Sequence, residues 1–342
     1  MRLLLIHTGG TLMMRGGHPT PLVPDVYQSD LLAELPVLRR VADIETQIFS
    51  NLDSSDMQPH HWVELAQAVH AALTARDASA ARRFDGVVIA HGTDTMAYTA
   101  SALAFLLPGL DRPVVLTGAQ RPIAEVRTDA RANVVDAFHL ATLPIPEVGV
   151  AFHARLLRGC RAIKRDAWSM DAFDSPACAP LASLGVTVEV GSHVLPPSEI
   201  APFDPRIEPA VLAVRAFPGL LPRLIHGALR AGVRGVVLEA FGSGNVPHLE
   251  NSLVPVIEDA RKRDIPVVIV SQCQRGDVDL RRYAGGRAAL EAGAIGAGTM
   301  TAEAAVAKLM ITLGRAGGDR VETARAAFSV EPRGEGMGVE RG

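Results

Sequence analysis

Two hydrophobic periodicities alternate along the chain and predict strands and helices arranged as βαβ units. Short, nearly continuous apolar runs are typical of strands covered on both faces, and apolar residues three and four apart are typical of helices. In the first half we expect strands at 3–7, 86–90, 114–117 and 148–152, and helices at 59–74, 95–107 and 128–142. This alternation predicts an α/β fold rich in parallel strands.

A proline-rich stretch divides the chain, and the alternation resumes after it. Residues 191–209 contain five prolines and predict a linker between two domains. Beyond it we expect strands at 211–216, 235–241 and 266–271, and helices at 220–231, 249–263 and 302–313. The predicted organisation is a large domain over 1–190, a smaller one over 210–330, and a flexible, glycine- and charge-rich tail over 331–342.

Composition narrows the class of protein. The 342 residues are 48% hydrophobic, and 34 Lys and Arg against 37 Asp and Glu leave a net charge of −3. This balance gives no electrostatic reason to expect a nucleic acid or an anionic membrane as partner. No apolar run approaches the roughly 18 residues of a membrane span, and the N-terminal run is too short for a signal peptide. Three cysteines without paired spacing argue against disulfides and zinc and favour a reducing, cytoplasmic setting.

Polar residues follow the predicted strands, where parallel sheets bind their ligands. Thr8-Gly9-Gly10-Thr11 follows the first strand; its glycines permit close backbone approach, although a plain tight turn explains them equally well. The segment is neither a phosphate-binding loop nor a dinucleotide fingerprint. His91-Gly92-Thr93-Asp94-Thr95-Met96 follows the second strand, and helix capping by Thr93 or Asp94 accounts for only one of these residues.

A third polar cluster precedes the helix at 59–74. Capping is plausible there for Asp56, whereas Ser54 and Ser55 are not explained by it. Hydroxyl and backbone N–H groups of such a pair suit a small carboxylate ligand.

Lysine is scarce, with three residues against 31 arginines. Lys262 and Lys308 lie in helical segments and are expected to be solvated charges. Lys164 lies in a segment of a different kind, Gly159 to Asp166. It is either one more surface cation or a buried lysine that loses its proton and acts as a general base, which arginine cannot do.

Taken together these segments resemble the L-asparaginase family of amidohydrolases. Thr8–Thr11 and His91–Met96 match its two signature segments, and three further matches occur in the family order: Asp53-Ser54-Ser55-Asp56-Met57, Thr117-Gly118-Ala119-Gln120-Arg121-Pro122 and Gly242-Ser243-Gly244-Asn245. The likeness spans about residues 1–330. The Asp-Ser-Ser-Asp-Met form and Ser271-Gln272-Cys273 are most similar to the cytoplasmic, type I bacterial branch.

The resemblance implies a two-domain α/β fold and hydrolysis of L-asparagine to L-aspartate and ammonia without metal or cofactor. It assigns Thr11 as the acylating nucleophile and Thr93, Asp94 and Lys164 as a second triad. Ser54 and Asp94 would hold the substrate's α-carboxylate and α-amino groups, and the Ala119 carbonyl would face the scissile amide. The remaining substrate contacts implied by the matched motifs are Gly10, Ser55 and Gly92, with Asn245 from a partner subunit.

The residue chemistry is coherent with these roles. A threonine hydroxyl needs a base, and Lys164 could serve through Thr93 if burial favours its neutral form. Asp94 opposes this because a carboxylate stabilises the ammonium, so either desolvation dominates or a water carries the proton. Backbone N–H groups near Gly10 or beside Thr93 are candidate oxyanion donors.

The chain departs from the family in two places. The loop after the first strand carries no tyrosine at the family's position; Tyr27 either replaces it in a closed lid, with Gly16-Gly17 as hinge, or is a core or rim aromatic. The segment 274–277 gives no clean match to the acidic residue that some relatives donate across a subunit interface. Selectivity between asparagine and glutamine is therefore open.

Two residues of the second domain, Asn245 and Cys273, each have two possible roles. Asn245 reaches a partner's active site in the family, which implies a homodimer or a dimer of dimers, or it caps structure in its own domain. Cys273 matches a residue of an allosteric asparagine site, or it is a buried apolar filler.

Three functions remain in competition. The leading hypothesis is a type I asparaginase. The second is a related amidohydrolase preferring glutamine or another amide, including an ammonia-supplying component of an amidotransferase; that relative has an additional N-terminal domain, whereas here the first signature strand begins at residue 3. The third is a catalytically silent sensor of aspartate or asparagine, which has no need of a nucleophile and a base.

Overall fold

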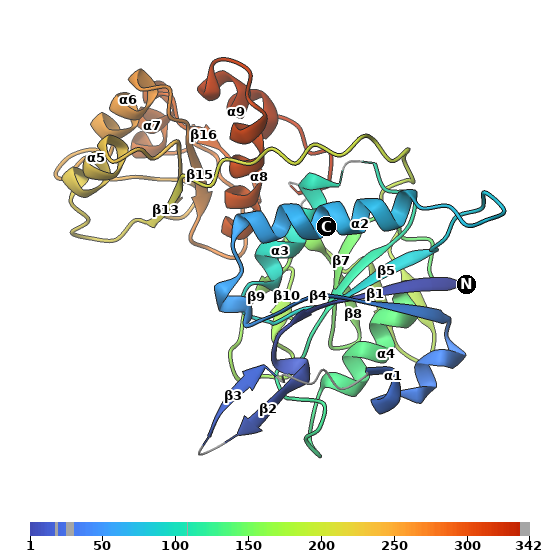
Figure 1. The fold of residues 1–342 in the computed structure, drawn as a ribbon. Helices are drawn as coiled ribbons and strands as arrows, with labels where there is room; N and C mark the ends of the chain where they lie inside the picture. Colours follow the sequence, from blue (N-terminus) through green and yellow to red (C-terminus); the bar gives the residue numbers. More distant parts are fainter. Residues whose placement is uncertain (18–19, 25–30, 108, 336–342) are drawn as a thin grey trace. The chain divides into compact units, whose positions relative to one another are not determined.

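The computed structural model describes residues 1–17, 20–24, 31–107 and 109–335, with 13–17 and 20–24 described by their backbone alone. Its chain divides into two compact units (Figure 1). The first comprises Met1–Ser175 and Ala179–Pro205, and the second comprises Pro176–Cys178 and Arg206–Gly342. Each unit is an α/β structure with its own sheet.

The first unit is built on an eight-stranded mixed sheet with the order β12-β11-β8-β7-β6-β5-β1-β4. Neighbours from β4 to β7 run parallel, and β8, β11 and β12 extend the sheet as antiparallel strands. The strands are β1 (Arg2–Gly9), β4 (Asp43–Leu52), β5 (Gly86–Ala90), β6 (Val114–Thr117), β7 (Val148–Phe152), β8 (Arg155–Arg158), β11 (Ala182–Leu184) and β12 (Val188–Val190). Two small pairs complete the unit, β2 (Met14–Gly17) with β3 (Thr20–Pro24) and β9 (Ile163–Lys164) with β10 (Phe173–Asp174).

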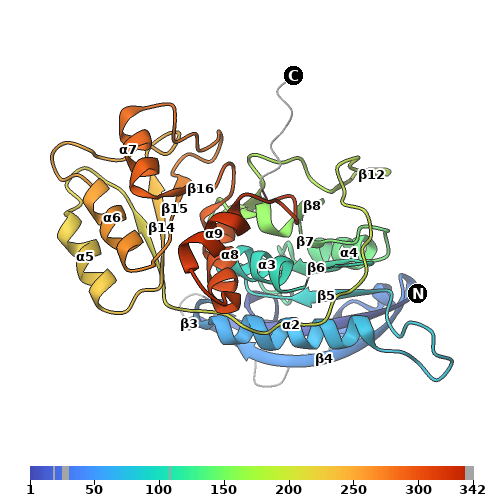
Figure 2. The ribbon, with the colours of Figure 1, turned by 90° about the horizontal axis from the view of Figure 1, so that it is seen from above.

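Helices cover both faces of this sheet (Figures 1 and 2). Helices α2 (Pro59–Thr74) and α3 (Met96–Leu106) lie on one face, and α4 (Ala130–Leu140) and α1 (Leu31–Glu34) lie on the other. Short 3-10 helices occupy Thr11–Met13, Pro36–Arg40, Ser54–Asp56 and Gly159–Arg161. Strands β5, β6 and β7 are buried along their whole length, as expected for strands covered on both sides.

A buried ion pair anchors part of the predicted linker to the first unit. Arg158 and Glu147 are 1% and 5% exposed, and Arg158 Nε lies 2.6 Å from Glu147 Oε2. Arg158 also donates to the His193 carbonyl at 2.8 Å, and Glu147 accepts from the Leu195 backbone N–H at 2.8 Å. Residues 193–195, which were predicted to belong to the linker, are therefore held by the first unit. The first unit ends at Pro205.

The second unit has a four-stranded parallel sheet with the order β13-β14-β15-β16. The strands are β13 (Val211–Arg215), β14 (Gly235–Ala240), β15 (Val267–Ser271) and β16 (Ile295–Gly296). Figure 2 shows its helices on both sides of the sheet. They are α5 (Pro222–Arg230), α6 (Val254–Lys262), α7 (Ala284–Ala292), α8 (Ala302–Arg315) and α9 (Arg320–Phe328).

The C-terminal end of this unit corrects two expectations. Lys308, predicted to be a solvated charge, is 6% exposed because α8 is buried along much of its length. Its ammonium donates to Glu335 Oε1 at 2.5 Å and to the Val330 carbonyl at 2.9 Å. Glu335 is fully buried, so the predicted flexible tail is anchored at this residue, although residues 331 and 332 are exposed. Residues 336–342 lie outside the described ones.

Candidate active site

The sequence motifs of the first unit meet at one edge of its sheet. Strands β4, β1, β5 and β6 are parallel neighbours, and a matched motif follows each of them at its carboxyl end. Segments that are far apart in sequence therefore lie side by side. This is where ligands bind in open α/β sheets.

Close backbone contacts join three of these motifs. A Cβ atom on Gly10, whose φ is +90°, would lie 2.4 Å from the Gly92 backbone nitrogen. A Cβ atom on Gly92 would lie 2.5 Å from Ser54 Oγ. Only glycine fits at either position, so these glycines bring the β1, β4 and β5 ends into contact rather than merely closing a turn.

Thr93, Asp94 and Lys164 form one hydrogen-bonded group. Lys164 Nζ lies 2.8 Å from Thr93 Oγ1 and 2.6 Å from Asp94 Oδ1. Thr93 is 5% exposed, whereas the Asp94 side chain is 63% exposed. Lys164 reaches the group from the two-residue strand β9, and its side chain is 19% exposed, so the surface-cation interpretation does not describe it.

The capping alternatives fail for these motifs. The N-cap of α3 is Thr95, which makes no side-chain capping bond, and neither Thr93 nor Asp94 takes its place. The N-cap of α2 is Gln58, not Asp56. Asp53 caps the 3-10 helix at Ser54–Asp56, where it accepts from the Ser55 N–H at 2.9 Å.

The remaining first-unit candidates surround this group. Ser54 is 4% exposed, and its carbonyl accepts the Thr95 hydroxyl at 2.7 Å. Ser55 is exposed, and its hydroxyl donates to Asp53. Ala119 is buried. Thr11 opens a 3-10 helix directly after Gly10 and is half-buried.

His91 lies beneath this edge as a neutral, enclosed group. It is fully buried, and its Nδ1 lies 2.7 Å from the Gly92 carbonyl oxygen. The pKa of His91 is lowered to about 4, because the effect of burial is larger than the opposing effect of the hydrogen bond with Gly92. The imidazole therefore donates from Nδ1 as a neutral ring at physiological pH.

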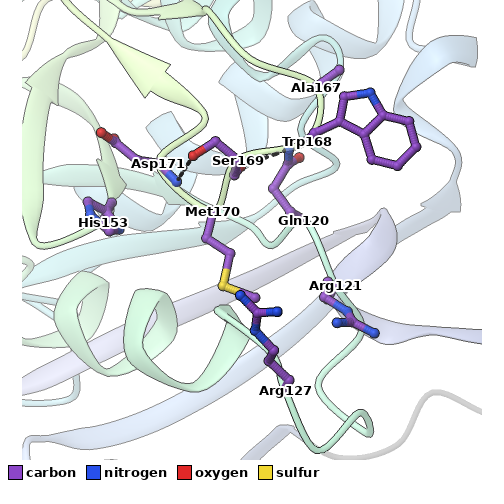
Figure 3. Close-up of a pocket in the computed structure, with 9 residues that line it drawn as sticks. All are labelled: Gln120, Arg121, Arg127, His153, Ala167, Trp168, Ser169, Met170 and Asp171. Carbon is purple, nitrogen blue, oxygen red and sulfur yellow. Dashed lines mark hydrogen bonds between the residues drawn. The ribbon is translucent and has the colours of Figure 1, made fainter.

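Gln120 was given no role by the sequence, yet it contacts the group directly. Its Oε1 accepts the Thr93 hydroxyl at 3.1 Å. It also lines a cavity of about 780 Å³ with Arg121, Arg127, His153 and the segment Ala167–Asp171 (Figure 3). The only signal in the sequence was its place in the motif after β6.

Other candidates lie outside this edge. Asn245 accepts the Gly286 N–H at 3.0 Å through Oδ1, which matches the capping interpretation within its own unit. Cys273 is exposed, so it is not a buried filler. Tyr27 lies outside the described residues. Within the described ranges, no cluster of three or more His, Cys, Asp or Glu side chains suited to a metal ion occurs.

Family models match both units. The model for "Asparaginase, N-terminal" matches residues 2–195, and the model for "Glutaminase/Asparaginase C-terminal domain" matches residues 210–328. The chain belongs to the asparaginase family. The expected two-domain asparaginase fold is thereby confirmed.

Individual asparaginases are similar over almost the whole chain. L-asparaginase of Thermococcus kodakarensis is 39% identical, covering 92% of this chain and 93% of its own, and L-asparaginase 1 of Escherichia coli is 36% identical over 96% of each. The crystal structure of L-asparaginase I from Vibrio cholerae superposes with a TM-score of 0.85 at 33% identity, covering 98% of each chain. A glutamyl-tRNA(Gln) amidotransferase component of Pyrococcus abyssi is 35% identical over 91% of this chain and 71% of its own.

Proposed function

We propose that this asparaginase-family chain is an L-asparaginase that hydrolyses L-asparagine to L-aspartate and ammonia through a threonine ester. The observation that carries the proposal is the Lys164–Thr93–Asp94 group, with bonds of 2.8 and 2.6 Å, at the same sheet edge as Thr11. A weak hydroxyl nucleophile and a nearby lysine base are the parts that covalent amide hydrolysis requires.

In the acylation step the Thr11 oxygen attacks the side-chain amide carbon of asparagine. Its proton passes to Thr93 as Thr93 gives its own proton to neutral Lys164. The tetrahedral intermediate then collapses: the carbon–nitrogen bond breaks, and Thr93 gives its proton to the leaving nitrogen and is reprotonated by Lys164 as ammonia departs. The product is an aspartyl ester on Thr11.

Deacylation reverses these roles with water. The water oxygen attacks the ester carbonyl, one of its protons moves through Thr93 to Lys164, and the carbon–oxygen bond to Thr11 breaks. The proton then returns to the Thr11 oxygen, which restores the free enzyme and releases aspartate. Backbone N–H groups of the Gly10 turn or beside Thr93 are the proposed donors to the oxyanion, each worth roughly 100- to 1000-fold in rate.

Substrate would be held by groups with matching charge. Asp94 is exposed enough to accept the α-ammonium, and Ser54 offers a hydroxyl beside the Gly10–Gly92 contact to the α-carboxylate. Gly92, Ser55 and the Ala119 carbonyl complete the proposed contacts. No metal or cofactor is needed for this chemistry.

The experiment is ammonia release from L-asparagine and, separately, from L-glutamine by the purified chain. Thr11→Ala and Thr93→Ala should each abolish asparagine turnover, because one removes the nucleophile and the other the proton relay. Thr74→Ala is the matched control, since Thr74 is exposed on α2 and bonds to the His70 carbonyl at 2.8 Å. Full activity in Thr11→Ala would overturn the nucleophile assignment.

A second candidate is hydrolysis of another amide, glutamine first. It is favoured by the 35% identity to a glutamyl-tRNA(Gln) amidotransferase subunit. A glutamine rate exceeding the asparagine rate would replace the leading proposal. Thermal stabilisation by aspartate with no ammonia from either amide would instead establish a sensor.

We also propose that the chain forms a homo-oligomer and that asparagine regulates it. A homodimer or dimer of dimers would bring Asn245 to a partner's site, and activity that stays constant on dilution to monomers would exclude this. An allosteric asparagine site at Cys273 predicts sigmoidal kinetics, and a hyperbolic curve would exclude it. Three free thiols, one of them exposed, suit a reducing cytoplasm.

A further inference from the structure

The orientation of the Gln120 amide is fixed by its partners. Its Nε2 donates to the Ser169 carbonyl at 3.2 Å and to the Asp166 carbonyl at 3.5 Å. Carbonyl oxygens only accept, so the NH₂ group must face them and Oε1 must face Thr93. Since Oε1 also only accepts, the Thr93 hydroxyl donates its single proton to Gln120 across 3.1 Å.

This direction has a consequence for Lys164. With its proton committed to Gln120, Thr93 has only lone pairs left for Lys164, 2.8 Å away. Lys164 must therefore be the donor of that bond, which suits its ammonium form. A neutral Lys164 can take the Thr93 proton only after the Thr93–Gln120 bond breaks.

The Gln120 backbone is held by a buried carboxylate. Asp129, 8% exposed, accepts the Gln120 N–H at 3.0 and 3.1 Å and the Arg121 N–H at 3.1 Å. Asp129 is itself bonded to the Asn133 amide at 3.0 Å, and that amide also donates to the Gly118 carbonyl at 3.0 Å. Gln120 is thus fixed at both its main chain and its side chain.

We propose that Gln120 is a positioning residue that directs the Thr93 proton away from Lys164 and thereby favours the ammonium form of the resting site. Because the same amide bonds to Asp166 and Ser169, the segment 166–169 is coupled to the proton position on Thr93. The catalytic meaning of this inference rests on the proposed function; the proton arrangement itself does not.

The charged groups already present around Lys164 are kept in both test variants. Asp94 forms an ion pair with Lys164. Helix α3, which packs against β9, contains no charged residue. On the paired strand β10, Asp174 forms ion pairs with Arg155 and with Arg165.

Two substitutions should move the acid limb of the kcat profile in opposite directions. Gln120→Met removes the acceptor and frees the Thr93 proton for neutral Lys164. The limb should then move about one pH unit lower, which corresponds to a tenfold change in the protonation equilibrium. Gln120→Glu keeps an acceptor and adds a negative charge that stabilises the ammonium, so the limb should move higher. KM for asparagine should be nearly unchanged. Gln67→Met, on the exposed face of α2, is the control and should move nothing.

A readout without turnover separates this inference from the proposed function. With three lysines in the chain, lysine labelled with ¹³C at Cε gives three signals, and Lys164→Arg identifies the one from Lys164. Its titration midpoint should fall in Gln120→Met and rise in Gln120→Glu. Unmoved midpoints, or shifts of the same sign in both variants, would overturn the inference even if the wild type releases ammonia. Absence of ammonia from the wild type would overturn the proposed function alone.

Discussion

His91 should make the stability of the first unit depend on pH. Its ring is fully buried, and burial lowers its pKa to about 4 from an ordinary 6.5. The unfolded chain therefore binds a proton at His91 below pH 6.5, while the folded chain does not until about pH 4. Because the folded pKa is depressed, the stabilisation is complete above pH 6.5 and is lost as the pH falls from 6.5 towards 4.

The size of this effect follows from the two pKa values. A shift of about 2.5 units corresponds to about 3 kcal/mol over the full range, and about 2 kcal/mol of it should be lost between pH 8 and pH 5. That is a large part of the 5–15 kcal/mol typical of folded domains. The proton would enter beside Gly92 and Thr93, so the active edge should be affected early.

Urea unfolding at several pH values measures this contribution. His91→Asn keeps a donor where Nδ1 bonds to the Gly92 carbonyl but cannot titrate in this range. The wild type should lose about 2 kcal/mol more than His91→Asn between pH 8 and pH 5. His60→Asn, at an exposed position of α2, should keep the wild-type slope. Parallel slopes for the wild type and His91→Asn would refute the reasoning.

Three further substitutions test the packing. Arg158→Met leaves Glu147 buried without its partner and should lower the free energy of unfolding by about 3–5 kcal/mol, measured by urea titration; a loss below about 1 kcal/mol would contradict the buried pair. Gly92→Ala should abolish ammonia release without unfolding the chain, because its Cβ would lie 2.5 Å from Ser54 Oγ and would displace that side chain. Retained activity would show that Ser54 can move without loss of function. Lys308→Met should increase proteolysis of the C-terminal segment by removing its bonds to 330 and 335; an unchanged cleavage pattern would contradict that anchoring.

Buried secondary structure was predictable because its environment is uniform. The strands at 86–90, 114–117 and 148–152 and the helix at 59–74 have the predicted bounds, since each presents a single clear periodicity. Strand β4 was missed because it lies at a sheet edge, where its side chains are half-buried or exposed without regular alternation and are largely polar. The antiparallel strands β8, β11 and β12 were missed because runs of three or four residues carry too little pattern.

The position of the site was predictable, whereas its proton arrangement was not. Motifs that follow parallel strands meet at one sheet edge, so Gly10 and Gly92 were expected together and are in contact. Ser54 joins them because it follows β4, a strand that the sequence did not predict. The direction of the Thr93 hydroxyl, however, depends on which end of the Gln120 amide faces it. Two backbone carbonyls much further along the chain decide that direction, and no local pattern encodes such a contact. Residue types therefore name the groups of a proton relay, and only the surrounding donors and acceptors determine which of them holds the proton.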